Sequence, residues 1–462
     1  MEQFNTCKVL SDWVSAFHFD SSNIALADSA RFRILDYIIS SVAGLKVNNA
    51  YNHAVERVMY SFGGNQQSSV LFCKRKVPAP FAAYMNASYG HGADLDDGHK
   101  TANGHPGVAV IPAVLALAEA EGSPCNDIYE AIISGYEVYI RVSNAIQPSA
   151  LQRGFHGTGV VGAVAASAAC AKLLHLDKNQ IFQAISYGTV QASGLFEVSE
   201  SGQMTKPVNP ANACHTGVIS ALMARTGIHA PDIPFEGVKG FYKAFSGAPN
   251  LEEITNGLGQ KLLIDTSYVK LYPACRHLHP VVDAGAILRK QEAFRLDKIS
   301  RIVINTYPNS ILVTGHIKKP VSADEGKFSM TYALAKSLLN GTYTLEDLDS
   351  CRNMDLETET LIDKMEIISN PAYENKEKHI RGCKVELYMT DEQKLEASVP
   401  LPKGDPEIPL TEQDILGKTA VCCEGIYDKK TQEKIYRCIV QDEKFLLSSL
   451  FDLLHCYNNM EG

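Results

Sequence analysis

The sequence predicts a mainly α-helical protein, with a helical, bundle-like main domain and a smaller α+β lid domain. Through about the first 240 residues, apolar side chains recur at three- and four-residue spacing, and strand-like alternation is nearly absent. Alternation begins after about residue 265. The chain has 462 residues. Because one hydrophobic core seldom exceeds roughly 250 to 300 residues, we expect two domains.

Helices are predicted throughout the first part of the chain, at Ala27–Val42, Asp127–Val142 and Ile181–Leu195. Between the last two, Gly159–Ala171 consists almost entirely of small, uncharged residues. This run is too short to span a membrane. Since small side chains allow helix backbones to approach closely, the run predicts a central helix surrounded by others.

The second domain is predicted from a strand, a hairpin and a helix. Side chains alternate over Ile302–Thr306, and Lys384–Met389 is expected to pair with Lys394–Val399 across a four-residue turn. Phe328–Leu339 is a predicted helix that the following Asn-Gly ends. Strands with interspersed helices indicate an α+β arrangement.

A linker and a helical tail complete the chain. Pro400–Pro406 has the proline and glycine content of a linker, and Thr411–Met460 returns to helical periodicity. The tail can therefore pack back on the first domain. We place the main domain at residues 1–265 with 405–462, and the lid domain at residues 266–404.

Composition excludes several classes of protein. The hydrophobic content of 45% and charged content of 21% are those of a globular enzyme. A net charge of -9 argues against a nucleic-acid partner. The N-terminus lacks a basic stretch followed by an apolar run, so we expect a cytoplasmic protein without a membrane partner. The 12 cysteines include no Cys-x-x-Cys pair, which excludes the usual zinc-ribbon and iron–sulfur signatures.

The first candidate site is the segment Gly92–Gly107, which gathers acids and imidazoles between glycines although both flanks are apolar. Its candidate residues are Asp94, Asp96, Asp97, His99 and His105. A polar loop set into a core is usually functional. Asp96 and Asp97 are expected to cap or orient neighbouring backbone.

Two further clusters precede helices. Gln152–Gly159 holds His156 among three glycines, where backbone N–H groups can bind a carboxylate. Met204–Ala213 holds Lys206 before a helix that we expect to begin near Cys214, and a lysine fixed by prolines suits anion binding. A tight turn with a surface histidine and a solvated loop lysine are the structural alternatives.

The fourth cluster, Lys270–Pro280, holds Arg276, His277 and His279 at the start of the second domain. A guanidinium beside two imidazoles can form a carboxylate clamp. Metal ligation by His99 with His105, or by His277 with His279, is an alternative, but neither spacing matches a known metal motif. The predicted site therefore contains no metal. Nucleophile-elbow, Walker and Rossmann signatures are also absent from the sequence.

These clusters, in this order, resemble the MmgE/PrpD family over nearly the whole chain. The most specific motifs are Asp-Leu-Asp-Asp and His-Pro-Gly within Asn86–Pro112, Gly-Phe-His-Gly-Thr-Gly, Thr205-Lys206, and Gly227–Pro231 followed by Glu236–Phe241. The family includes 2-methylcitrate dehydratases, cis-aconitate decarboxylases and an iminodisuccinate epimerase. The resemblance implies a helical main domain completed by the tail, an α+β lid, a homodimer, and an active site between the domains without metal or organic cofactor.

The resemblance also assigns residues. Carried over one by one, the family's active-site residues fall on Asp94, His105, His156, Lys206 and either His277 or His279. Substrate contacts are expected from five further cationic or imidazole side chains: His99, Arg276, His279, His316 and Lys319.

Three departures distinguish this chain from the decarboxylases of the family. It has Asp96-Asp97-Gly98 where their sequences resemble Asp-Asp-Thr, with His99 next and one extra residue before His105. It has His316 where they carry a tyrosine, and Asn209 where a histidine commonly follows the lysine. These changes favour a reaction other than cis-aconitate decarboxylation.

The sequence therefore predicts a metal-independent lyase, a dehydratase of the 2-methylcitrate type, acting on a small hydroxy di- or tricarboxylate. Lys206 and Arg276 would bind carboxylates, His156 or His105 would exchange the carbon proton, and Asp94 would orient a histidine. His277 or His279 would protonate the leaving hydroxyl. Decarboxylation, epimerisation of a dicarboxylate such as iminodisuccinate, and carboxylate binding without turnover are the alternatives.

Overall fold

Two units make up the chain. The computed structural model describes residues 4–200, 204–375, 380–442 and 445–456. Unit 1 contains the described residues up to 92, from 96 to 268, and from 422 onward; unit 2 contains 93–95 and 269–421. The units are helical and α+β respectively, as the sequence predicts.

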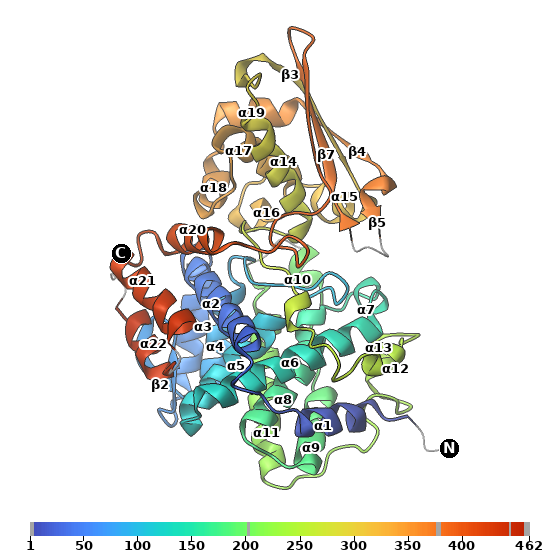
Figure 1. The fold of residues 1–462 in the computed structure, drawn as a ribbon, viewed down its shortest axis with the longest axis vertical. Coiled ribbons are helices and arrows are strands. Elements are labelled where there is room, and N and C mark those ends of the chain that lie inside the picture. Colours follow the sequence, from blue (N-terminus) through green and yellow to red (C-terminus); the bar gives the residue numbers. More distant parts are fainter. Residues whose placement is uncertain (1–3, 201–203, 376–379, 443–444, 457–462) are drawn as a thin grey trace. The chain divides into compact units, whose positions relative to one another are not determined.

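The helices of unit 1 are drawn from blue to yellow-green in Figure 1, with the last two in red. They are α1 (Thr6–Ala16), α2 (Ile24–Val47), α3 (Asn49–Ser61), α4 (Ala79–His91), α5 (Pro106–Glu121), α6 (Cys125–Ile146), α7 (Ser149–Gln152), α8 (Gly157–Leu173), α9 (Lys178–Val190), α10 (Glu197–Glu200), α11 (Val208–Arg225), α12 (Phe241–Phe245), α13 (Glu252–Thr255), α21 (Lys429–Tyr436) and α22 (Leu447–Leu454). A short antiparallel pair, β1 (Ser68–Val70) and β2 (Cys73–Val77), was not predicted.

Helix α8 lies at the centre of unit 1, where it packs against α5, α6, α9 and α11. All its residues are buried. A methyl group added at Gly162 would lie 2.9 Å from the Cβ atoms of both Ala109 on α5 and Ala213 on α11. The prediction of a central, small-residue helix is confirmed, and its backbone is as close to its neighbours as the sequence indicated.

Among the helix boundaries that differ from the prediction, two lie next to predicted site residues. Helix α11 begins at Val208 instead of near Cys214, because Pro210 occupies the first turn, where proline is tolerated. Helix α9 ends at Val190, before the predicted Leu195. The early start of α11 places Asn209 within its first turn, beside Lys206.

Unit 2 is built on a four-stranded sheet with the order β4-β3-β7-β8. Its strands are β3 (Ile299–Thr306), β4 (Met365–Ser369), β7 (Cys383–Met389) and β8 (Lys394–Val399), with a separate pair β5 (Glu374–Asn375) and β6 (Ile380–Arg381). Strands β3 and β4 are parallel and the other neighbours antiparallel. The predicted strand and hairpin are both present.

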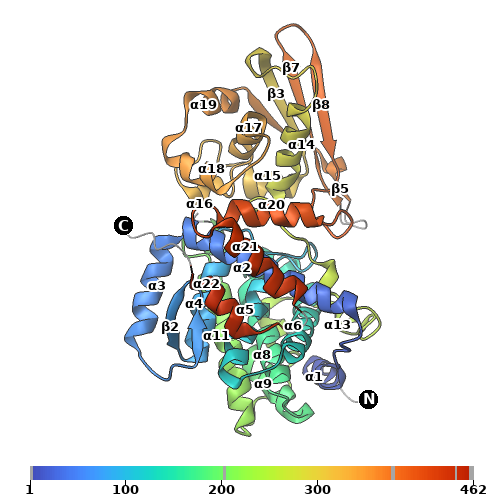
Figure 2. The same cartoon turned by 60° about the vertical axis from the view of Figure 1, so that its left-hand side comes forward.

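Helices accompany this sheet. They are α14 (His279–Arg289), α15 (Pro308–Thr314), α16 (Ala323–Gly326), α17 (Met330–Asn340), α18 (Leu345–Ser350) and α19 (Leu356–Asp363). Helix α14 packs against β7 and β8, and α17 packs against α14 (Figure 2). Gly341 ends α17 with φ of 80°, a left-handed conformation that favours glycine.

Residues 405–421 group with unit 2, whereas the predicted division placed them with the main domain. Polar contacts within unit 2 hold this segment: Arg276 donates to Asp405 at 2.6 Å, and Lys418 donates to the Leu95 carbonyl at 3.2 Å. Helix α20 (Glu412–Cys423) ends just past the division. The predicted helical tail extends to Met460, beyond the described residues.

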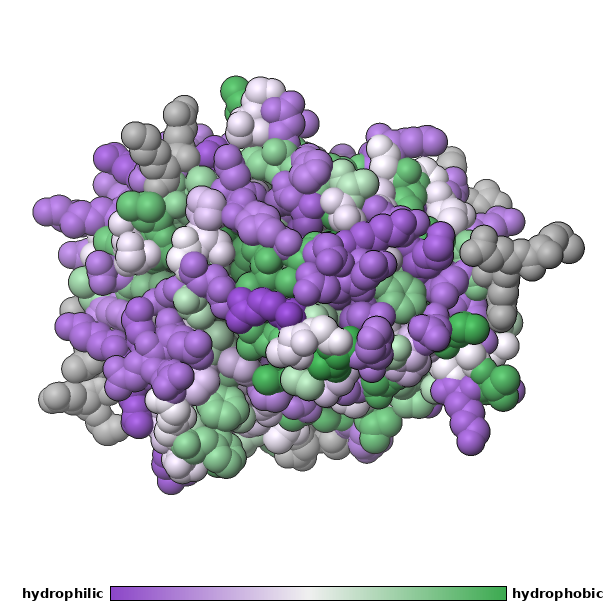
Figure 3. All heavy atoms as spheres, turned by 90° about the horizontal axis from the view of Figure 1, so that it is seen from below, coloured by the Kyte–Doolittle hydropathy of each residue, from purple (hydrophilic) through white to green (hydrophobic). Residues whose placement is uncertain are grey.

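Every helix of the described chain is too short or too polar to cross a bilayer. Figure 3 shows one face, in which hydrophilic and hydrophobic side chains are interspersed. Scattered apolar side chains of this kind are ordinary on protein surfaces.

Candidate active site

The loop between α4 and α5 is held by backbone pairing within unit 1. Gly98 exchanges two hydrogen bonds with Tyr268, at 3.1 and 2.8 Å, and the His99 N–H donates to Gly104 at 2.9 Å. Asp96 and Asp97 are buried at 1% and 3% exposure. Because the loop is paired on both sides, its acidic side chains have fixed positions.

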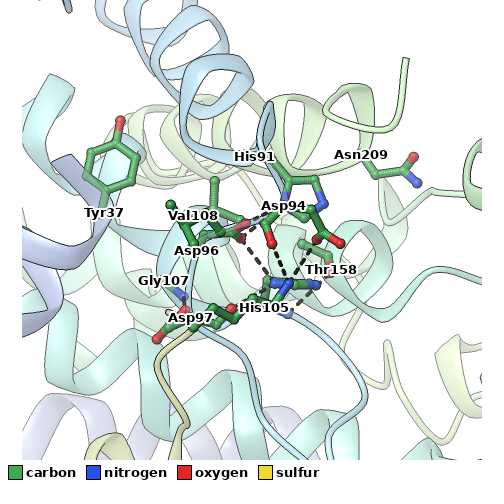
Figure 4. Close-up of polar contacts among 12 residues, drawn as sticks. Tyr37, His91, Asp94, Asp96, Asp97, His105, Gly107, Val108, Thr158 and Asn209 are labelled. Carbon is green, nitrogen blue, oxygen red and sulfur yellow. Dashed lines mark hydrogen bonds and ion pairs between the residues drawn. The ribbon is translucent and has the colours of Figure 1, made fainter. Parts of the chain in front are cut away.

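Asp96 lies between two imidazoles (Figure 4). Its Oδ2 atom is 2.9 Å from Nδ1 of His91 and 3.1 Å from Nδ1 of His105. Nδ1 of His105 also lies 2.7 Å from the Asp97 carbonyl oxygen. Carboxylate and carbonyl oxygens only accept, so both Nδ1 atoms donate a proton. In each neutral ring, Nε2 then carries the lone pair.

The charges of this cluster follow from burial and proximity. Burial alone would raise the pKa of Asp96, but His91 and His105 hold it well below its usual range. Burial lowers the pKa of His91 to about 4, against the attraction of Asp96 and with the help of Lys206. At neutral pH, Asp96 is therefore an anion and His91 is neutral.

Asp97 has a different environment. It accepts from the Gly107 N–H at 2.9 Å and from the Tyr136 hydroxyl at 2.7 Å, and Arg33 lies 3.6 Å away. Burial raises its pKa to about 6, although Arg33 opposes this. The contact with Gly107 satisfies an N–H in the first turn of α5. The expectation that an acid of the loop orients backbone therefore fits Asp97 but not Asp96.

His156 adds a third imidazole. Its ring centroid lies 6.1 Å from that of His91, and it precedes α8 as the N-cap residue. Its Nδ1 atom lies 2.8 Å from Nδ2 of Asn209, which also donates to the Leu195 carbonyl at 3.1 Å. His156 and Asn209 are both buried. Lys206, one turn before Asn209, is half-buried and close enough to His91 to lower that pKa.

Both ring nitrogens of His99 form hydrogen bonds within unit 1. Nδ1 accepts from the Ala102 N–H at 3.1 Å, so Nε2 carries the proton toward Thr266 at 3.0 Å. The His99 ring thus braces the loop that contains it.

In unit 2, Asp94 pairs with a lysine. Nζ of Lys270 lies 3.0 Å from Oδ1 of Asp94 and 2.7 Å from its carbonyl oxygen, and Lys270 is 1% exposed. Asp94 has φ of 53°, a conformation that Asp tolerates better than most residues. Sequence reasoning noted Lys270 only as the first residue of its cluster.

The other predicted residues of unit 2 fall into two groups. Arg276 donates to Asp405, to the Lys403 carbonyl and to Nδ1 of His279, which anchors residues 402–405. Nε2 of His279 then donates to the Ala274 carbonyl at 3.3 Å. His277 contacts the Tyr307 hydroxyl through Nδ1, and burial lowers its pKa to about 3.

His316 and Lys319 lie on the surface of unit 2. Lys319 pairs with Asp363 at 2.9 Å, an exposed ion pair. His316 is exposed. These two residues are not part of the buried groups described above.

The possibility of a metal rests on His91, Asp96 and His105, which can each offer a ligand atom within 4.8 Å of the others. Both Nδ1 atoms donate to Asp96, so a metal ion would have to bind the two histidines through their Nε2 atoms, as histidines oriented by a carboxylate do in many metal sites. The three side chains form one hydrogen-bonded group through Asp96.

His91 is the residue that sequence reasoning missed in this cluster. It is the last residue of α4 and lies directly before Gly92, where the predicted site segment begins. Its Nε2 atom is buried and has no hydrogen-bond partner among the described residues. The available signal was a histidine at the end of an apolar helix, five positions before Asp96.

Comparison with known proteins covers both units. The family models described as the MmgE/PrpD N-terminal domain and C-terminal domain match residues 8–254 and 272–442. The cis-aconitate decarboxylase-like protein oryM of Aspergillus oryzae is 26% identical over 462 residues, 95% of this chain and 95% of that protein. The cis-aconitate decarboxylase of Aspergillus terreus is 26% identical over 96% of this chain and 94% of that protein. The human cis-aconitate decarboxylase is 29% identical over 63% of this chain and 62% of that protein.

Proposed function

The chain belongs to the MmgE/PrpD family and is a lyase, and we propose that it decarboxylates a small tricarboxylate of the cis-aconitate type. Similarity to cis-aconitate decarboxylases along nearly the whole chain supports this reaction. For this reason we propose decarboxylation first, and not the dehydration that the sequence alone favoured. The observation that carries the proposal is the cluster of His91, Asp96 and His105 in unit 1, with His156 and Lys206 beside it.

The reaction breaks a carbon–carbon bond and forms a carbon–hydrogen bond. The electron pair of the departing carboxylate stays on the substrate carbon and spreads onto a neighbouring carboxylate, while carbon dioxide leaves. A cation near those oxygens stabilises the charge, and we assign this role to Lys206. Lysine acts here as a compact positive charge.

A proton must then reach the carbon. We assign its delivery to Nε2 of His105, because Asp96 and the Asp97 carbonyl accept from Nδ1 and stabilise the imidazolium form. Asp96 stays ionised beside it and orients the ring, as the carboxylate does in other acid–histidine pairs.

Dehydration of a hydroxy tricarboxylate of the 2-methylcitrate type is the second candidate. The same His105 can remove a proton next to a carboxylate when its Nε2 is unprotonated. The departure at Gly98, where Tyr268 occupies the space of a side chain, favours a substrate that differs from that of the decarboxylases.

The proposal is tested with purified protein and four substrates, supplied separately: cis-aconitate, 2-methylcitrate, citrate and iminodisuccinate. Carbon dioxide release from cis-aconitate supports decarboxylation. Alkene absorbance from 2-methylcitrate without carbon dioxide selects dehydration, and loss of optical activity from iminodisuccinate selects epimerisation. Absence of any reaction with all four overturns the proposal.

We also propose that the enzyme needs no metal or organic cofactor and that it is a homodimer. Activity that survives dialysis against a chelator supports the first statement, and activity lost to the chelator and restored by zinc or iron contradicts it. Light scattering tests the second: a mass twice the 50.5 kDa of one chain is expected, and a mass of 50.5 kDa contradicts it.

A further inference from the structure

We infer that Asn209 is a positioning residue that holds His156 in the tautomer protonated at Nε2. In that state His156 donates a hydrogen bond to the substrate and does not act as a base. The assignment of the tautomer stands on geometry alone, and its consequence for the reaction rests on the proposed function.

The orientation of the Asn209 amide is fixed by a backbone group. Its Nδ2 atom lies 3.1 Å from the carbonyl oxygen of Leu195, which can only accept. The same Nδ2 atom lies 2.8 Å from Nδ1 of His156. An amide nitrogen has two N–H groups and no lone pair to offer, so Nδ1 of His156 must be the acceptor. The ring proton is therefore on Nε2.

Packing leaves the amide little freedom to turn over. Asn209 is 5% exposed and lies in the first turn of α11. A methyl group added at Gly194 would lie 3.2 Å from Oδ1 of Asn209, and one added at Gly159 would lie 3.2 Å from its Cβ. These two glycines leave room for the amide beside His156 and little else.

Backbone contacts also hold the ring of His156 in place. The backbone N–H of His156 donates to the Gly194 carbonyl at 3.0 Å, and His156 is the N-cap residue of α8. The edge of its ring meets Phe196, with centroids 5.6 Å apart. Asn209, at the start of α11, and His156, at the start of α8, are therefore both hydrogen-bonded to the Gly194–Leu195 segment.

The imidazolium form of His156 is disfavoured by its surroundings. A proton on Nδ1 would face the N–H groups of Asn209, which can offer it no acceptor. A neutral imidazole with a fixed N–H is a hydrogen-bond donor that can stabilise a developing oxyanion. His105 has the opposite arrangement, with Nδ1–H on Asp96 and its lone pair on Nε2. The two imidazoles thus have different roles.

The tautomer is measured directly by NMR of protein labelled with ¹⁵N in its 14 histidines, through long-range correlations between ring nitrogens and carbon-bound protons. Loss of one signal set in His156→Gln assigns the residue. The expected pattern places the proton on Nε2 of His156 in the wild-type chain. A proton on Nδ1, or rapid exchange between both forms, overturns the inference, and no variant of Asn209 is needed for this result.

Asn209→Asp reverses the polarity of the contact at almost constant size. Its carboxylate accepts from Nδ1, so the His156 signal is expected to change to the Nδ1–H form and kcat to fall at least 10-fold with little change in KM. Asn23→Asp is the matched control, because Asn23 is an exposed helix cap and Asp caps equally well. An Asp variant that folds and keeps the wild-type tautomer contradicts the inference. Absence of turnover in the wild-type enzyme contradicts the proposed function and leaves the tautomer result standing.

Discussion

The Nδ1 atom of His105 lies 3.1 Å from Oδ2 of Asp96, and both residues are buried. The same Oδ2 atom accepts from His91 at 2.9 Å. One carboxylate therefore fixes the tautomers of two imidazoles. In the proposed mechanism Nδ1 of His105 therefore holds the ring in place, and Nε2 delivers the proton.

Replacement of Asp96 by Asn is predicted to reduce kcat on the order of 10² or more with a smaller change in KM. The amide keeps the size of the side chain but loses the charge that favours the imidazolium of His105. Steady-state kinetics on the preferred tricarboxylate measure the effect. Asp12→Asn, at a half-exposed ion pair, is the control. Kinetics within twofold of wild type would remove Asp96 from the proposed mechanism.

Protonation of His91 is predicted to destabilise the fold in acid. Its pKa of about 4 lies below the unfolded value of about 6.5. Between these pH values the unfolded chain binds more protons, so the free energy of unfolding falls as the pH falls. The resulting loss in the free energy of unfolding is roughly 3 kcal/mol. It is absent above pH 6.5 and complete by about pH 4.

The measurement is urea unfolding at pH 7 and pH 4.5 for wild type and His91→Asn. The asparagine amide can replace the Nδ1 donor but does not titrate, so the pH dependence of the variant should be weaker. His175→Asn is the control, since His175 is exposed and has a φ of 51° that asparagine accepts. Equal pH dependence in wild type and His91→Asn would show that His91 is not a buried neutral group.

Gly98→Thr is predicted to displace Tyr268. A Cβ atom at position 98 would lie 2.4 Å from the Tyr268 hydroxyl oxygen, so the phenol ring must move. We expect a loss of roughly 1 to 3 kcal/mol in the free energy of unfolding. Gly417→Ala is the control, because its added methyl group meets nothing within 4 Å. The double variant Gly98→Thr, Tyr268→Ala should recover part of the loss; a single variant as stable as wild type would place Tyr268 elsewhere.

Lys206→Ala is predicted to weaken turnover through charge. Removal of the ammonium group should reduce kcat on the order of 10² if it stabilises the anionic intermediate. The same substitution should raise the pKa of His91, because Lys206 lowers it. Kinetics and the NMR titration of His91 test the two effects separately. A normal kcat would exclude the catalytic role of Lys206. An unchanged titration of His91 would show that the Lys206 ammonium group does not lie close to His91.

The sequence predicted elements whose signals are local. The small residues of Gly159–Ala171 predicted a central helix because larger side chains would keep neighbouring helix backbones apart. Asn340-Gly341 predicted the end of α17 because glycine readily adopts the left-handed conformation found there. The hairpin of β7 and β8 followed from alternation around a short turn. Each of these depends on residues adjacent in the chain.

The pairing of the acids could not be predicted in the same way. Asp94 and Asp96 are two positions apart, yet Asp94 contacts Lys270 and Asp96 contacts His91 and His105. The direction of each side chain depends on the left-handed backbone at Asp94 and on a lysine 176 positions away. Composition located the loop, and only the tertiary structure separates the roles of its acids.

The most direct test follows decarboxylation of cis-aconitate in deuterium oxide by wild type and Asp96→Asn. If His105 and Asp96 deliver the proton, wild-type enzyme should release one carbon dioxide and place one deuterium on carbon per turnover. The variant should lose both to the same extent. Carbon dioxide release at the wild-type rate by Asp96→Asn, with deuterium still incorporated, would contradict the assignment of the proton to this pair.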